Sequence, residues 1–282
     1  METIVRTIVG AQLQTCQLLG KQLPDGVYRS LNELLDISKT VKPTATDMQI
    51  LQYVTIGNGG HRMVVGTRSI AKPEPVQHSP RHTGLYNQLP FIMRLPASDL
   101  TPAERINYRL RTTIDVGGTK YVAYYAKKLD LSETAPVLEL RTVKDGGATI
   151  STPFVNISSD LKPVPPDISS GGVLITTGDY IAATAKVPFT LSPDEVDEFL
   201  NVCNIIYGDD GYAMISEIGL CSGVDRVVST LISGVATNIT EAINVHIIGF
   251  INTFFAVKFT NDGINVLLDT GSVEPLLALS RA

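Results

Sequence analysis

Hydrophobic positions near the beginning of the chain follow the spacing of amphipathic helices. In residues 1–39 the apolar side chains recur at helical intervals, and the segment Pro24–Asp25–Gly26 separates a first helix from a second. These side chains are Ile4, Ile8, Leu13, Leu18 and Leu19 in the first helix and Leu31, Leu34, Leu35 and Ile37 in the second. We expect a helical N-terminal arm over residues 1–39, which either packs on the body of the protein or reaches a neighbouring subunit.

The pattern changes to that of short strands over residues 40–157, which we expect to form a β-rich domain. Ile50 to Ile56 can form a strand, and the run Gly57–Asn58–Gly59–Gly60 that follows predicts a tight turn, because glycine and asparagine tolerate positive φ. Residues 66–84 contain three prolines and predict an extended loop, and Leu89 to Leu95 can form another strand. Thr101–Pro102–Ala103–Glu104 has the form of a capping box and predicts a short helix.

A β-hairpin is expected around Gly117–Gly118. Alternating segments, Tyr108 to Val116 and Thr119 to Ala126, flank the two glycines. Tyr121, Ala123 and Tyr125 share one face of the second strand, and apolar residues also occupy the opposite face. Such a hairpin is expected to be covered on both sides.

Residues 158–175 predict a linker, because prolines 163, 165 and 166 alternate there with serine and glycine. We expect an α+β domain over residues 176–282. Its clearest element is a helix that begins with the capping box Ser192–Pro193–Asp194–Glu195 and ends at Gly208. The predicted apolar stripe of this helix is Val196, Phe199, Leu200, Cys203 and Ile206.

The rest of this domain predicts mainly strands. Ala213 to Leu220 has the pattern of a buried strand, and Ile243 to Ile251 fits a helix or a strand. Phe254 to Phe259 and Ile264 to Asp269 flank Asn261–Asp262–Gly263, which predicts a second hairpin. The fold class expected from the whole pattern is α+β, with a β-rich body of antiparallel hairpins, a helical N-terminus and one clear helix in the C-terminal half.

Composition and charge narrow the possible functions. The chain has 282 residues, 18% of them charged, and a formal net charge of −5, which argues against phosphate-backbone binding as its main task. Arg105, Arg109 and Arg111 form a local basic cluster, for which a solvated face is the simplest interpretation. Nucleic acid is therefore not an expected partner. An apolar run long enough for a membrane-spanning helix is missing from the sequence, so we expect no membrane association.

The three cysteines, Cys16, Cys203 and Cys221, form no CxxC motif and give no disulfide framework. Each has apolar neighbours and is expected to be a small core residue. This usage fits a protein that folds in a reducing cytoplasm.

Motifs that could carry chemistry are incomplete. The glycine run at 57–60 continues with His61 and Arg62 and then prolines, whereas a dinucleotide loop needs a third glycine and a following helix. His78 and His82 are four residues apart, but Pro80 between them opposes a helical metal pair, and two loop histidines, at an interface or elsewhere, are the simpler interpretation.

The remaining candidate groups also have simpler explanations. Asp209–Asp210–Gly211 resembles a fragment of a calcium loop and predicts a turn after the helix. Ser222 lacks the nucleophile-elbow pattern, and the sequence does not show whether Glu217 and Asp225 face one another. We therefore expect no catalytic residue, no metal site and no cofactor.

Four segments resemble virion proteins of tailed bacteriophages, in particular tail-collar and baseplate-associated domains. The first is Leu51–Gln52–Tyr53–Val54–Thr55–Ile56–Gly57–Asn58–Gly59, a strand followed by a glycine-rich turn. The second is Arg81–His82–Thr83–Gly84–Leu85–Tyr86 with the strand Pro90–Phe91–Ile92–Met93–Arg94. The third is Met214–Ile215–Ser216–Glu217–Ile218–Gly219–Leu220, and the fourth is Ile264 to Asp269 followed by Gly271.

The resemblance implies a structural subunit of the baseplate, tail or neck, which is not an enzyme and has no active site to carry over. Its partners would be other virion proteins and copies of itself, and it would be assembled in the bacterial host cytoplasm and located in the virion. Residues 120–175 depart from the short tail-collar domains. Two other functions stay open: an enzyme with an unrecognised site, and a ligand- or glycan-binding module in which exposed tyrosines at 121–125 stack on the ligand.

Overall fold

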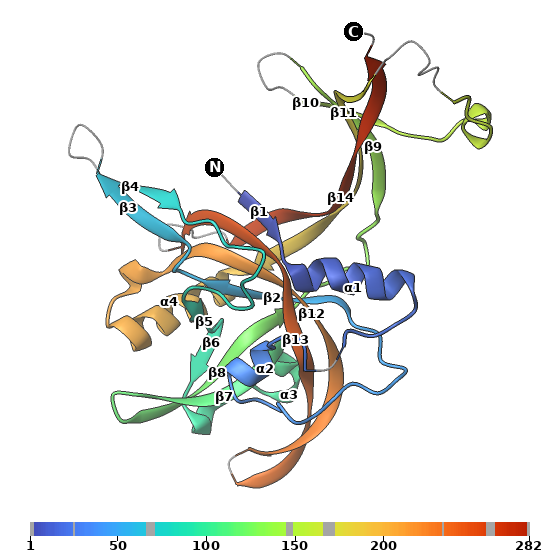
Figure 1. Cartoon of the computed structure of the whole chain (residues 1–282). Coiled ribbons are helices and arrows are strands. Elements are labelled where there is room, and N and C mark those ends of the chain that lie inside the picture. Colours follow the sequence, from blue (N-terminus) through green and yellow to red (C-terminus); the bar gives the residue numbers. More distant parts are fainter. Residues whose placement is uncertain are drawn as a thin grey trace. The chain divides into compact units, whose positions relative to one another are not determined.

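The computed structural model (Figure 1) divides the chain into two compact units. The first comprises residues 1–130 and 190–265, and the second comprises residues 131–189 and 266–282. The predicted linker at 158–175 lies within the second unit, and the predicted N-terminal arm is counted in the first. The structure describes residues 3–24, 26–65, 71–144, 149–165, 173–232, 234–257 and 263–280.

An eight-stranded sheet forms the body of the first unit. Its main path runs in the order β1-β13-β12-β2-β8-β6, with β5 paired to β2 and β7 paired to β8, and every one of these pairings is antiparallel. The strands are β1 (Thr3–Arg6), β2 (Ile50–Gly57), β5 (Gln88–Leu89), β6 (Ile92–Arg94), β7 (Tyr108–Val116), β8 (Thr119–Lys128), β12 (Met214–Ile232) and β13 (Val235–Ala256). The β7–β8 hairpin confirms the prediction made from Gly117–Gly118.

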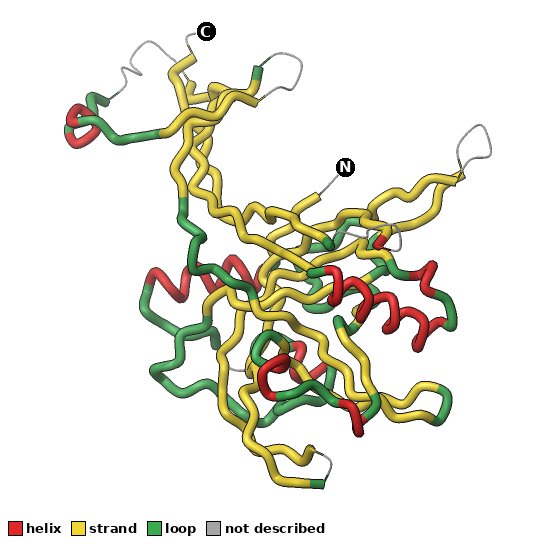
Figure 2. The backbone as a smooth tube through the Cα atoms, turned by 180° about the vertical axis from the view of Figure 1, so that it is seen from behind, coloured by secondary structure: helices red, strands yellow, loops and turns green. Residues whose placement is uncertain are grey.

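The two longest strands of the first unit, β12 and β13, form one hairpin (Figure 2). The segment predicted as a strand from Ala213 to Leu220 is the beginning of β12, and the ambiguous segment from Ile243 to Ile251 is strand in β13. Three register shifts interrupt the pairing between Ile215 and Val224. Such irregularities increase the local bend and twist of a ribbon. The first half of β12 is buried, whereas exposed and half-buried residues alternate along its second half.

The described part of the first unit contains four α-helices. They are α1 (Ile8–Leu18), α2 (Leu31–Leu34), α3 (Pro102–Arg105) and α4 (Pro193–Tyr207). The described residues also contain three short 3-10 helices. Of these, η1 (Pro96–Ser98) and η3 (Asp210–Tyr212) lie in the first unit, and η2 (Ser158–Leu161) lies in the second. α1 packs on β13 with Val9, Leu13 and Cys16 buried, which supports the packed alternative for this segment. Within the described residues, none of these helices is both long and apolar enough to cross a membrane.

Residues 3–6 correct the prediction of a continuous N-terminal helix. They form β1, in which Ile4 pairs with Ile251 of β13. The helix begins only after Thr7, whose side chain accepts a hydrogen bond from the Gly10 N–H as an N-cap. The edge of β13 offers these residues backbone partners that the local sequence pattern does not reveal.

Local signals predicted α3 and α4 well. Both helices have the full capping box, with Thr101 and Glu104 in α3 and with Ser192 and Glu195 in α4. Gly208 ends α4 in the left-handed region, at φ 71°. Val196, Phe199 and Cys203 are buried as predicted, and so is Val202, which the predicted stripe omitted.

A separate two-stranded hairpin consists of β3 (His61–Val65) and β4 (Ala71–Pro75). This hairpin corrects the prediction of one extended loop over residues 66–84, because residues 71–75 form a strand. Residues 76–87 form a loop without a helix or strand. Residues 66–70 lie outside the described residues. Pro73 and Pro75 occupy β4, where a two-stranded ribbon leaves one edge unpaired and tolerates proline.

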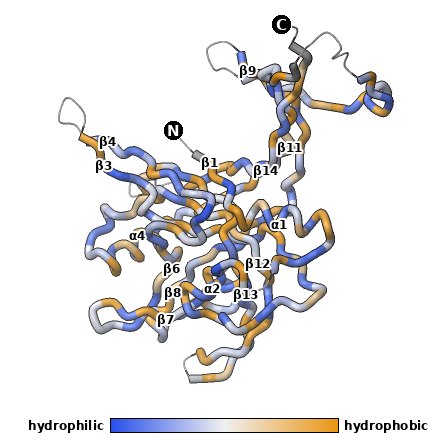
Figure 3. Tube along the Cα trace, in the orientation of Figure 1, coloured by the Kyte–Doolittle hydropathy of each residue, from blue (hydrophilic) through white to orange (hydrophobic). Residues whose placement is uncertain are grey.

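The second unit contains a four-stranded sheet in the order β10-β9-β11-β14. Its strands are β9 (Val137–Val143), β10 (Thr149–Pro153), β11 (Val173–Leu191) and β14 (Ile264–Ser280). Asn261 and Asp262, at the centre of the second predicted hairpin, lie outside the described residues, and in the described part of the chain β14 pairs with β11. Figure 3 shows hydrophobic residues along β11 and β14 as well as within the sheet of the first unit.

Candidate functional site

The glycine-rich turn after β2, the loop before β5 and strand β12 meet at one buried carboxylate. Glu217 of β12 accepts hydrogen bonds from the backbone N–H groups of Gly59, Tyr86 and Asn87, at 3.0, 2.9 and 2.9 Å. The fourth group is His78, whose Nε2 lies 2.8 Å from Glu217 Oε2. Both side chains of this pair are fully buried.

These contacts explain why the acid is ionised inside the protein. Burial raises the free energy of a charged carboxylate, but the His78 contact and the three backbone donors outweigh that effect and lower the pKa of Glu217. One side chain therefore satisfies two loops whose backbone donors would otherwise be buried without partners.

The glycine run serves this packing. A Cβ on Gly60 would lie 2.6 Å from Ser216 O, and a Cβ on Gly57 would collide with Asn87 O and Glu217 Oε1. The Gly60 N–H donates instead to Ser216 Oγ, at 3.0 Å. The glycines are therefore required because β12 approaches the turn closely.

His78 and His82, the pair found four residues apart in the sequence, are in contact. Their Nδ1 atoms are 3.1 Å apart, and the Ser79 N–H also points at His82 Nδ1, at 3.3 Å. The His78 ring lies between Phe250, at a centroid distance of 3.9 Å, and Tyr86, at 4.2 Å. His78 Nε2 must carry a hydrogen, because an ionised carboxylate only accepts. The result is a chain of polar contacts from Glu217 through His78 to His82.

His82 is only partly buried and lines a cavity of about 720 Å³. Arg29, Glu33, Arg81 and Tyr86 also line it. Arg29 forms an ion pair with Glu33 at 3.1 Å. Partial burial and, to a smaller degree, the neighbouring His78 and Arg81 lower the pKa of His82. The ring is therefore neutral at pH 7 unless an anion approaches.

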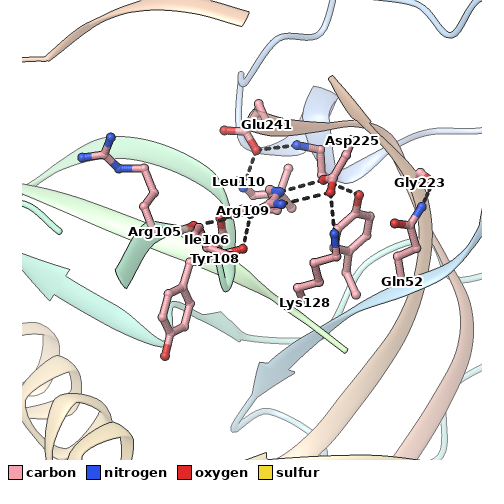
Figure 4. A network of polar contacts seen from close by, with 12 residues as sticks. Gln52, Arg105, Ile106, Tyr108, Arg109, Leu110, Lys128, Gly223, Asp225 and Glu241 are labelled. Atoms are coloured by element: carbon pink, nitrogen blue, oxygen red, sulfur yellow. Dashed lines mark hydrogen bonds and ion pairs between the residues drawn. The ribbon is translucent and has the colours of Figure 1, made fainter. Parts of the chain in front are cut away.

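A second polar network joins β2, β7, β8 and β12 around Asp225 (Figure 4). Arg109 donates from Nε and Nη2 to the two oxygens of Asp225, at 2.7 and 3.0 Å. Lys128 Nζ and Tyr53 Oη also donate to it, each at 2.8 Å. Burial opposes ionisation here too, but these donors hold the pKa of Asp225 at about 2.

Glu241 of β13 lies beside this network and is almost fully buried. It accepts from the backbone N–H groups of Leu110, Arg111 and Ala242, at 2.6, 3.2 and 2.8 Å. Burial dominates here and raises the pKa of Glu241, although the three donors act in the other direction. Leu110 has φ 55°, so this carboxylate fixes the backbone at a strained position of β7.

A cavity of about 840 Å³ opens beside the first turns of α4. Two of its acidic residues are paired: Glu198 with Arg94, and Glu195 with Lys127 at 2.6 Å, while Glu104, Asp194 and Asp197 add further negative charge to the walls. Tyr108 also donates to Glu195. These contacts fasten the N-terminus of α4 to β6, β7 and β8.

The structure brings together some of the residues that the sequence singled out and separates others. Glu217 and Asp225 lie on the same strand but belong to different networks, with different basic partners. Ser222 is fully buried and its hydroxyl has no hydrogen-bond partner in the described part of the chain. Asp209 accepts from the Gly211 N–H at 2.7 Å, which confirms a turn after α4.

The structure corrects one interpretation of surface residues and narrows another. The arginines expected on a solvated face are paired: Arg109 with Asp225, and Arg105 and Arg111 with Asp99. In the segment 121–125, where exposed tyrosines were considered for stacking on a glycan, Tyr124 and Tyr125 are buried and Tyr121 is half-buried. The basic cluster was misinterpreted because its acidic partners, Asp99 and Asp225, lie elsewhere in the sequence, whereas the burial of Tyr124 and Tyr125 agrees with a hairpin covered on both sides.

The cysteines are buried and free, as expected for core residues. Burial raises the pKa of Cys203 to about 12 and also raises the pKa of Cys221. Among the described residues, no group of three or more histidine, cysteine, aspartate or glutamate side chains is arranged to hold a metal ion. The sequence analysis gave no polar role to Tyr53, Asp99 or Glu241, which the structure places in polar networks.

Comparison with known proteins gives one result. Neither the curated proteins nor the solved structures provide a match to this chain. A family model described as a family of unknown function, DUF7208, matches residues 1–282. The chain therefore belongs to the DUF7208 family.

Proposed function

We propose that this chain is a structural subunit of a tailed-phage particle, in the baseplate, tail or neck. It would act by assembly, through contacts with other virion proteins and with copies of itself. The proposal rests on the resemblance of four segments and on the apolar surfaces that the fold leaves uncovered.

The outer end of the β12–β13 hairpin is the observation that carries the proposal. Val227, Leu231 and Val235 are 64 to 67% exposed there. A two-stranded ribbon has no second layer to cover its apolar side chains, and such ribbons are marginally stable alone. Contact with a neighbouring subunit would bury these side chains and fix the hairpin.

The sheet of the second unit supports the same function. Its strands expose Val137 and Val143 of β9, Ile150 of β10, and Val273 and Leu277 of β14, each between 42 and 59%. Apolar sheet surfaces are normally covered by another layer. A subunit of an assembly can obtain that layer from its neighbours.

The segments behind the resemblance also have a common structural role. The glycine-rich turn, the segment from Arg81 to Tyr86 and the segment around Glu217 meet at the same buried carboxylate. The resemblance therefore concerns residues that build one junction of the fold, and it supports a shared architecture more than a shared chemistry.

Light scattering of the purified chain over a range of concentrations tests the proposed assembly. The paired change Val227→Thr and Leu231→Gln should weaken self-association by about 3 kcal/mol, roughly a hundredfold in Kd, because two apolar side chains lose their burial. Ile106→Gln is the matched control, since Ile106 is also exposed (64%) but lies on a short loop after α3. Equal behaviour of the two variants would contradict a role for the hairpin in self-association.

A further inference from the structure

The cavity beside His82 has a chemical character that assembly does not require. His82 Nδ1 is occupied by contacts with His78 and the Ser79 N–H. Its Nε2 is therefore the ring nitrogen available to a ligand, in a ring that lines the cavity. Arg81, the residue before His82, lines the same cavity, and its side chain forms no ion pair with any other described residue.

The charges around this wall favour an anion. Arg29 and Glu33, which also line the cavity, form an ion pair with one another at 3.1 Å. Glu217, the acid behind His78, has its oxygens satisfied by His78 and three backbone donors, so it offers no free acceptor to a cation. Arg81 then remains as the unopposed charge, and a guanidinium suits phosphate and sulfate groups.

The contact between the two histidines can complete such a site. When His82 is protonated, its Nδ1–H can donate to His78 Nδ1 while His78 Nε2–H continues to donate to Glu217, and the Ser79 N–H then no longer has an acceptor at His82 Nδ1. His82 Nε2–H is then a charged donor in the cavity wall next to Arg81. Phe250 and Tyr86 hold the His78 ring between them, so the acceptor for His82 is fixed in place.

From these contacts we infer that the cavity lined by Arg81 and His82 is a binding site for an oxyanion group, a phosphate or a sulfate. Arg81 supplies the permanent charge. His82 supplies the second donor and takes up a proton as the anion binds. Tyr86 and Leu85 provide the less polar part of the wall, against which the carrier of the anion can rest.

The inference predicts that binding weakens as pH rises. Around the His82 ring the charged and titratable groups are His78 and Arg81 in its own loop, Arg29 and Glu33 at α2, Tyr86, and Glu217 of β12 behind His78. Of these, His82 is the group that changes charge on binding. An anion favours its charged form, so a proton is taken up and the affinity is greater at low pH.

Sulfate is the first probe, because it keeps its double charge across the pH range in which histidine titrates. The experiment follows the His82 ring signals by NMR during sulfate addition at constant ionic strength, with chloride as the balancing anion. We expect a saturable shift, with an affinity several-fold greater at about pH 5.5 than at about pH 8. Arg81→Gln should weaken binding roughly tenfold, since a charge-assisted contact is lost.

Matched variants separate this site from a general salt effect. Lys120→Gln removes an exposed cation from the β7–β8 hairpin and should leave sulfate binding unchanged. His82→Gln should abolish the pH dependence but keep weak binding through Arg81. The inference is overturned if sulfate leaves the His82 signals unmoved in the wild-type protein, or if Arg81→Gln and Lys120→Gln respond alike.

A second pair of titrations identifies the source of the anion. Inorganic phosphate and glucose 6-phosphate share the oxyanion, but only the second carries a sugar ring. Tighter binding of the sugar phosphate would assign the site to a phosphorylated saccharide, and equal binding would assign it to the free anion. Glucose alone should not bind, and binding of glucose as tight as that of its phosphate would contradict the inference.

Discussion

Glu217 and His78 are separated by 139 positions in the chain, yet their side chains meet at 2.8 Å in the interior of the first unit. The same carboxylate receives the backbone of the glycine-rich turn and of the loop that leads to β5. Glu217 of β12 therefore links the glycine-rich turn after β2 to the loop before β5.

Replacing Glu217 by glutamine tests the importance of this charge. The amide nitrogen would face donors such as His78 Nε2–H or the Tyr86 N–H, so buried donors would oppose one another. We expect a loss of about 3 kcal/mol in the free energy of unfolding, measured by urea denaturation.

Glu74→Gln is the control for that change. Among the described residues, Glu74 forms ion pairs with Arg62 and Lys72, whose side chains are 70% and 65% exposed. Its replacement should cost no more than about 0.5 kcal/mol. A similar cost for both variants would show that Glu217 is not the centre of the junction.

The acid sensitivity of the fold should depend on Asp225. Its ordinary pKa of 3.8 falls to about 2 in the folded protein. A depressed pKa contributes stability that is present above the unfolded value and is lost as pH falls through the folded value. The shift corresponds to about 2 kcal/mol, lost between about pH 4 and about pH 2.

Urea denaturation at several pH values measures this contribution. Asp225→Asn should lower stability at neutral pH, because Arg109 and Lys128 lose their charged partner. It should also flatten the fall in stability below pH 4. A variant with the same pH slope as the wild-type protein would show that Asp225 does not titrate as described.

The close approach of Ser216 to Gly60 predicts that a larger residue at position 60 destabilises the fold. Gly60→Ala would place a Cβ 2.6 Å from Ser216 O, where the backbone must move, and we expect a loss of about 2 kcal/mol or more. At Gly84 the nearest atom to an added Cβ is Leu34 Cδ2, at 3.8 Å. Gly84→Ala should therefore be tolerated, and thermal melts of both variants should separate by several degrees.

The helix cap of α4 can be tested in the same way. Ser192 accepts a hydrogen bond from the Glu195 N–H, and Glu195 reaches back to the Ser192 N–H. Ser192→Ala should cost about 1 kcal/mol in the free energy of unfolding. Ser229→Ala, on an exposed position of β12, should leave stability nearly unchanged, and a loss as large as that of the cap variant would contradict this account.

The parts of the fold that local chemistry determines were predictable. Capping boxes specify α3 and α4, and Gly117–Gly118 specifies the β7–β8 hairpin, because each signal lies within a few residues of the element it controls. Partners distant in sequence left no such signal. Thr3–Arg6 is a strand because β13 lies beside it, and β14 follows a turn-like sequence but pairs with β11.

The candidate site also combines features that the local sequence predicts with features that depend on tertiary packing. His78 and His82 were recognisable as a pair, because they are four residues apart. Their link to Glu217 and the burial of Arg109 against Asp225 depend on how distant strands pack, which composition and spacing do not encode. The sequence therefore identified the residues of the junction without the geometry that connects them.

The proposed place of this chain in a virion is tested most directly by the protein content of purified phage particles. The proposal predicts that a tailed phage encodes the chain, and that mass spectrometry of its gradient-purified particles detects the chain in a fixed ratio to the other tail, baseplate or neck proteins. That ratio should persist through repeated purification. A chain that is abundant in the infected cell but missing from the purified particles would contradict the account.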